Sequence, residues 1–128
     1  MSARRQQSVV AGISLVYDLA IGLALLAATD RVASLFGVVV PEPRLFVTLT
    51  GLFLVCVGLG YSQPMRDPAN HRAYLWIFGP LLKGAGAIVF TWEHLVNGAP
   101  ASYLLFASTD GVLAIATLVA LLNRDERG

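Results

Sequence analysis

The fold is decided by the first long apolar stretch of the chain, which reads VVAGISLVYDLAIGLALLAAT from Val9 to Thr29. A helix of about 20 residues crosses a bilayer, so this stretch is long enough to span one. Comparable apolar stretches follow at residues 45–62, 73–95 and 101–122. The loops between them are too short to hold a soluble domain. We therefore predict one transmembrane domain over residues 1–128, an all-α bundle of four helices at about 9–29, 45–62, 73–95 and 101–122.

The composition supports a membrane protein. Of the 128 residues, 56% are hydrophobic and 13% are charged, whereas soluble domains carry about 25% charged residues. This excludes a disordered chain, a basic nucleic-acid module and most soluble enzymes, and the net charge of +1 gives no reason to expect a nucleic-acid partner. A single cysteine, Cys56, excludes an intramolecular disulfide and a cysteine-based zinc site. We expect Cys56 to be a small buried residue.

The arginines predict the orientation. Two of those outside the predicted spans, Arg31 and Arg44, fall on one side of the membrane. Six fall on the other side: Arg4, Arg5, Arg66, Arg72, Arg124 and Arg127. The positive-inside rule then places both termini in the cytoplasm. The first apolar run is too long for a typical signal peptide and contains Asp18, so we expect it to remain as a helix.

Aromatic residues mark the expected edges of the membrane. Trp76 and Trp92 lie 16 residues apart in the third segment, which is about 24 Å along a helix. One indole in each interface is the arrangement that tryptophan favours. Tyr61 and Tyr103 are expected to be interface anchors too.

Two local features modify the helices. Pro80 removes one helical hydrogen bond and clashes with the carbonyl of Trp76, so we predict a kink at Gly79 and Pro80. The segment from Asp30 to Gly37 places Val32, Leu35 and Phe36 on one side. It suits either a short helix on the membrane surface or an ordered loop.

Three charged residues lie near the midpoints of their segments: Asp18, Lys83 and Asp110. At 1.5 Å per residue, all three fit within about 5 Å of one depth. Each charge at mid-bilayer costs at least about 2.5–3.5 kcal/mol. We therefore expect the first, third and fourth helices to meet around a polar cluster that includes Tyr17, which adjoins Asp18.

Two carboxylates and one ammonium would leave this cluster with an excess negative charge. A shared proton, a bound cation or an unseen cationic group would balance it. Three roles remain open for the cluster: a structural ion pair, a site for protons, ions or a ligand, and a contact with a partner subunit. No metal or cofactor is predicted, because His71 and His94 lie on opposite sides and cannot both ligate a haem inside the bilayer.

In several of its motifs the chain resembles the broad DoxX-like group of small bacterial four-helix membrane proteins. The resemblance covers nearly the whole chain. It includes Tyr17-Asp18, Leu35-Phe36-Gly37, Asp67-Pro68, Lys83 and Asp110. It implies an integral protein of the bacterial inner membrane. Small multidrug transporters also carry a first-helix carboxylate, here Asp18, but Lys83 would compete with a cationic drug.

Three functions are compatible with these observations. We expect first a non-catalytic accessory or assembly subunit of a larger membrane complex, because the chain is small and its helices carry glycine-rich faces. The alternative is a proton- or ion-coupled small-molecule carrier, using Asp18, Lys83 and Asp110. The second alternative is a membrane enzyme acting on a lipid or quinone, with a carboxylic acid and Lys83 as an acid/base pair. The expected partners are the lipid bilayer and either other membrane subunits or a second copy of the chain.

Overall fold

The computed structural model of the chain describes residues 2–40 and 42–123. Over these residues the protein is all-helical, with no strand. Four helical runs are long and apolar enough to cross a membrane, namely Ala3–Ala27, Leu45–Arg66, Arg72–Asn97 and Ser102–Leu122. The all-α class and the presence of four long apolar helices are thereby confirmed.

The first and last runs are single helices, and the two middle runs are divided. The elements are α1 (Ala3–Ala27), α2 (Thr29–Phe36), α3 (Leu45–Gly60), α4 (Ser62–Arg66), α5 (Arg72–Trp76), the π-helical turn η1 (Ile77–Leu81), α6 (Leu82–Asn97) and α7 (Ser102–Leu122). Helix α1 begins six residues before the predicted start at Val9. The Ser2 hydroxyl caps it by accepting a hydrogen bond from the Arg5 backbone nitrogen at 3.2 Å, a capping role that a hydropathy pattern does not detect.

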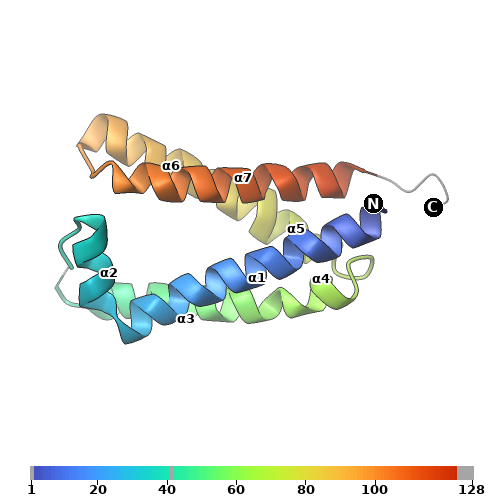
Figure 1. Ribbon diagram of the computed structural model, residues 1–128, viewed down its shortest axis with the longest axis horizontal. Coiled ribbons are helices and arrows are strands. Elements are labelled where there is room, and N and C mark those ends of the chain that lie inside the picture. The colour runs from blue at the N-terminus through green and yellow to red at the C-terminus, as the bar shows by residue number, and fades with distance from the viewer. Residues whose placement is uncertain (1, 41, 124–128) are drawn as a thin grey trace.

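The helices form two layers (Figure 1). Helices α1 and α3 make one layer, and α6 and α7 make the other. Glycines allow the close contact in the first layer, because a Cβ atom on Gly22 would lie 2.8 Å from the Gly51 carbonyl oxygen. The layers join mainly where α1 contacts α7, with a smaller contact between α4 and α5, whereas α3 has little contact with α6 or α7 in the described chain.

The two layers are closer at one end than at the other (Figure 1). The close end holds the start of α1 and the end of α7. There the Gln7 side chain donates to the Ala120 carbonyl, and Arg72 donates to the Leu121 carbonyl, both at 3.0 Å. The last carbonyls of a helix lack helical partners. These two side chains therefore satisfy the end of α7 and bind it to α1 and α5.

Helix α2 crosses between the layers at the more open end (Figure 1). The Phe36 ring lies 4.8 Å from the Phe106 ring of α7, and the Ser102 hydroxyl donates to the Phe36 carbonyl at 2.5 Å. Of the two structures considered for this segment, the helix is therefore present. Leu35 is 82% exposed, whereas the Phe36 ring packs against α7.

The predicted kink in the third span coincides with a change of helix type. Pro80 lies inside η1, where the backbone adopts a π-helical turn. Proline removes an amide donor, and such turns accommodate a missing hydrogen bond. The neighbouring Gly79 faces Thr117 of α7, and a Cβ atom there would lie 2.6 Å from the Thr117 methyl carbon. The turn thus sits against α7 directly before Lys83.

Candidate functional site

The strongest polar contact inside the bundle joins α1 to α6. The Lys83 ammonium donates to the Asp18 carboxylate at 2.8 Å, and each side chain is only 4% exposed. Both residues lie near the middle of helices that could cross a membrane. An ion pair removed from solvent in this way is stable only when both charges are matched, since one left alone would be strongly unfavourable.

The inward face of α1 positions Asp18. The buried residues of this helix recur every three or four positions and are all small or polar: Ala3, Gln7, Ala11, Ser14, Asp18 and Gly22. This spacing puts them on one side of a helix. Large apolar side chains of α1, such as Val16 and Leu23, are exposed instead. The helix therefore turns its polar side toward the protein and its apolar side outward, as expected in lipid.

Tyr61 covers the ion pair from the end of α3. It is completely buried, and the Lys83 nitrogen lies 5.1 Å from the centre of its ring, a distance at which a cation is attracted to an aromatic face. Tyr74 of α5 packs edge-on against this ring at 5.0 Å and donates its hydroxyl hydrogen to the Val57 carbonyl.

The prediction of Tyr61 as an interface anchor was therefore wrong. Its apolar neighbours and its place at a helix end favoured that interpretation. A different signal was available, because Tyr61 lies three residues after Gly58, and Gly58 is on the face that packs against α1.

Asp110 lies beside the ion pair but does not join it. Its carboxylate faces α6 at Gly86, where a Cβ atom would lie 3.3 Å from the carboxylate oxygen. The Tyr17 hydroxyl lies near this carboxylate and 2.5 Å from the Thr109 hydroxyl. Among the described residues, no arginine, lysine or histidine forms a salt bridge with Asp110.

Two further polar atoms belong to this cluster. The Ser14 hydroxyl, one turn from Asp18, and the Tyr61 hydroxyl are both buried and have no hydrogen-bond partner within the described chain. Most buried hydroxyls in proteins are hydrogen-bonded to protein or to water. We refer to Ser14, Asp18, Tyr61, Lys83 and Asp110, together with Tyr17 and Thr109, as the central cluster.

The other residues singled out in the sequence lie outside the central cluster. Trp76 and Trp92 are 39% and 60% exposed, as residues facing lipid would be. Cys56 is exposed, so the expectation that it is buried was wrong; it lies on the outer side of α3, next to the packed face formed by Val57 and Gly58. Across the described chain, no group of three or more histidine, cysteine or acidic residues could hold a metal ion.

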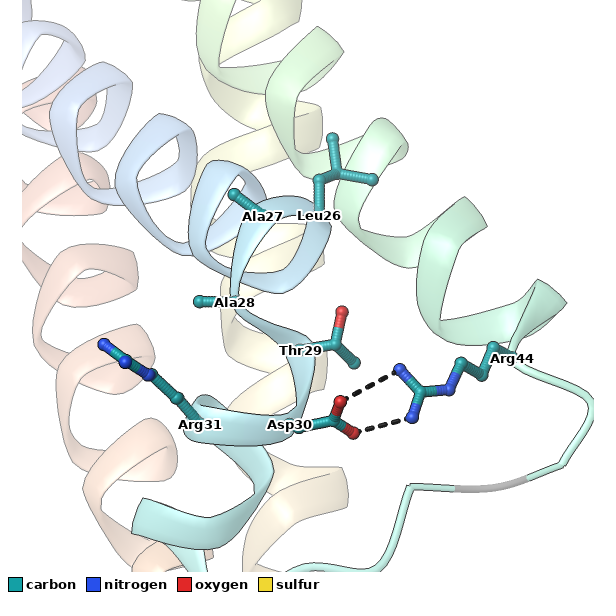
Figure 2. A pocket seen from close by; sticks show the side chains of 7 residues that line it. All are labelled: Leu26, Ala27, Ala28, Thr29, Asp30, Arg31 and Arg44. Atoms are coloured by element: carbon teal, nitrogen blue, oxygen red, sulfur yellow. Dashed lines mark hydrogen bonds and ion pairs between the residues drawn. The ribbon is translucent and has the colours of Figure 1, made fainter.

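A second ion pair lies at the surface, at the turn between α1 and α2. Arg44, just before α3, makes two hydrogen bonds to the Asp30 carboxylate, at 2.7 and 3.3 Å. This contact with Asp30 raises the pKa of the Arg44 guanidinium above its ordinary value. The pair borders a hollow of about 590 Å³ that Arg31 also lines, and Figure 2 shows the Arg31 side chain pointing away from the Asp30–Arg44 pair.

Comparison of the chain with protein families, with curated proteins and with solved structures gives no match. The chemistry of the site must therefore be argued from its own geometry. That geometry is a buried ion pair, a second carboxylate beside it, and two buried hydroxyls without partners.

Proposed function

We propose that this chain is a small integral membrane protein of the DoxX-like type, and that it acts as a non-catalytic accessory or assembly subunit of a larger membrane complex. Four helices of sufficient length and apolarity support the membrane assignment. The bacterial inner membrane is the location implied by the resemblance to DoxX-like proteins.

The proposed orientation has both termini in the cytoplasm. The ends of α1 and α7 that lie together carry Arg4 and Arg5, and the nearby turn between α4 and α5 carries Arg66 and Arg72. The opposite end carries Arg31 and Arg44. Arg124 and Arg127 lie outside the described residues. An excess of arginine at one end supports placing that end inside.

The open arrangement of the helices is the observation that carries the proposal. In a closed four-helix bundle each helix packs against two neighbours, but here α3 packs along α1 and has little contact with α6 or α7. Both α3 and α6 present large exposed apolar side chains, among them Leu49, Phe53, Ile88 and Val89. These surfaces suit contact with helices of another subunit. The glycines of α3, in contrast, serve contacts within the chain: Gly51 and Gly58 both face α1.

Extraction of the native protein in mild detergent, followed by intact-mass analysis, tests this proposal. We expect the chain to be released together with larger subunits. Leu49→Trp on α3 and Ile88→Trp on α6 should reduce co-purification. Ile115→Trp, at an equally exposed site on α7, should leave it unchanged. Release of the wild-type chain alone, or only as a homo-oligomer, would contradict the proposal.

One observation favours the proton- or ion-coupled carrier as a second candidate. Asp110 is a carboxylate in a candidate membrane span with no cationic partner among the described residues, and such residues mark ion and proton pathways in many transporters. A carrier predicts proton movement across vesicles of phosphatidylethanolamine and phosphatidylglycerol that contain the protein, followed with a pH-sensitive dye. Asp110→Asn should abolish that movement while the protein stays folded.

A further inference from the structure

The central cluster contains more acid than base. Two carboxyl groups, Asp18 and Asp110, face one ammonium group, Lys83. The other titratable side chains around them are Tyr17 from α1, Tyr61 from the end of α3 and Tyr74 from α5, all neutral at neutral pH. No arginine or histidine of the described chain forms an ion pair with either carboxylate.

Lys83 balances one of the two carboxylates. Its nitrogen lies 2.8 Å from Asp18, and each side chain is 4% exposed, so this pair is complete. Asp110 keeps a partly buried position in a candidate span, where an unbalanced negative charge is costly. Among the described residues no further positive charge balances it, which leaves a proton or a metal cation as the source.

The surroundings of Asp110 favour a proton. An alkali or alkaline-earth cation needs several oxygen ligands at once, whereas a proton needs one carboxyl oxygen and benefits from a hydrogen-bond acceptor. The Tyr17 hydroxyl lies near the carboxyl group and 2.5 Å from the Thr109 hydroxyl. Thr109 also donates its hydroxyl hydrogen to two carbonyls of its own helix, those of Leu105 and Phe106. Few oxygens are therefore left to surround a metal ion.

The buried hydroxyls of Ser14 and Tyr61 give an independent sign of a small hydrogen-bonding guest. Both are completely buried, neither has a partner in the described chain, and both lie on the Asp18 side of the cluster. A water molecule held there would satisfy both hydroxyls.

We propose that the central cluster is a binding site for one exchangeable proton, held on the carboxyl group of Asp110 while Asp18 stays ionised against Lys83. Binding forms an O–H bond on Asp110, and release returns the proton to water and leaves the carboxylate. This proposal does not depend on the protein being an accessory subunit or a carrier.

Infrared spectroscopy of the full-length protein tests the proposal by counting carboxylic acids. The sample is labelled with ¹³C-aspartate and held near neutral pH in sodium-free buffer. The number of bound protons should equal the number of carboxyl groups in the cluster minus the number of ammonium groups. Wild type should therefore show one aspartic acid C=O band, and both Asp110→Asn and Asp18→Asn should show none.

Lys83→Met should show two bands, and the exposed-site control Ser108→Ala should keep one. If Lys83→Met fails to fold, the two asparagine variants still decide the count. A wild-type protein with no acid band would overturn the proposal, as would a band that persists in Asp110→Asn. A wild-type band that disappears when sodium is added would show instead that a metal cation balances the charge.

Two tyrosine variants locate the proton. Tyr17→Phe removes the hydroxyl beside Asp110 and should shift the frequency of the acid band. Tyr61→Phe removes the hydroxyl on the Asp18 side and should leave that frequency unchanged. The reverse pattern would place the proton on Asp18 and contradict the assignment to Asp110.

Discussion

Two of the three ion pairs among the described residues have almost the same distance and opposite surroundings. Lys83 and Asp18 lie 2.8 Å apart and are each 4% exposed. Arg44 and Asp30 lie 2.7 Å apart and are 49% and 72% exposed (Figure 2). Judged by distance alone, the surface pair should contribute at least as much to stability as the buried pair. Burial reverses that order, because removing one member of a buried pair leaves a charge that water cannot reach.

The largest effect is expected from breaking the buried pair. Lys83→Met should lower the free energy of unfolding by about 3–5 kcal/mol, because Asp18 loses its ion-pair partner. Unfolding in mixed detergent micelles with increasing dodecyl sulfate measures this change. The double variant Asp18→Leu with Lys83→Met should recover most of the loss. A single variant as stable as wild type would show that the pair contributes nothing to the fold.

The next effect tests what keeps the pair buried. Gly79→Ala would place a Cβ atom 2.6 Å from the Thr117 methyl carbon, which must push η1 away from α7 one turn before Lys83. We expect a cost of about 1–3 kcal/mol, as for other overpacked sites. Gly84→Ala is the matched control on the same span, since its nearest neighbour, the Ala114 Cβ, would be 3.9 Å away. Equal stability of the two variants would contradict the proposed role of the η1 contact.

A smaller effect is expected from the aromatic side of the buried pair. Tyr61→Leu removes the ring that lies 5.1 Å from the Lys83 nitrogen, and a cation–π contact shielded from water contributes up to about 2 kcal/mol. Tyr61→Phe keeps the ring and removes a hydroxyl that has no hydrogen-bond partner within the described chain, so it should be close to wild type in stability. If both variants lose the same amount, the hydroxyl and not the ring is the stabilising group.

The sequence could predict the helices of this protein better than their contacts. A long apolar run identifies a membrane helix because its length and composition are local properties. The four candidate spans are long apolar runs of this kind. Their positions agree with the apolar stretches in the sequence, except at the ends of the helices. The start of α1 was missed because Ser2, Arg5 and Gln7 are polar, yet Ser2 caps the helix and Gln7 binds the end of α7.

Which side chains of two helices meet depends on how each helix is rotated about its own axis. The depth of a residue in the membrane does not specify that rotation. The sequence predicts one depth for Asp18, Lys83 and Asp110, so it grouped all three but did not indicate which aspartate binds Lys83. The faces decide this: Asp18 is on the small and polar side of α1, whereas Asp110 is turned toward Gly86 and Tyr17. Tyr61 and Cys56 were misassigned for the same reason, since each was judged by residue type without its helical face.

The surface pair is expected to give a small effect. Arg44→Ala should lower stability far less than Lys83→Met does, and the loss should shrink as salt concentration rises, because exposed pairs are screened. Unfolding of this variant and of wild type at low and high salt measures the difference. A loss as large as that of Lys83→Met, or one that salt does not change, would mean that Arg44 has a role beyond its pair with Asp30.

The smallest effect concerns an exposed carboxylate near the close end of the bundle. The Asn70 side chain donates a hydrogen bond to Asp67 at 2.7 Å, and this bond lowers the pKa of the Asp67 carboxyl below its usual value. A carboxyl whose pKa is lower in the folded state adds stability above its unfolded pKa, about 3.9, and loses it as pH falls through the folded value. Asn70→Ala should therefore cost slightly more at neutral pH than in acid. If the cost is the same across that pH range, the bond does not distinguish the two protonation states of Asp67. Burial would then be the only condition under which an electrostatic contact affects the stability of this fold.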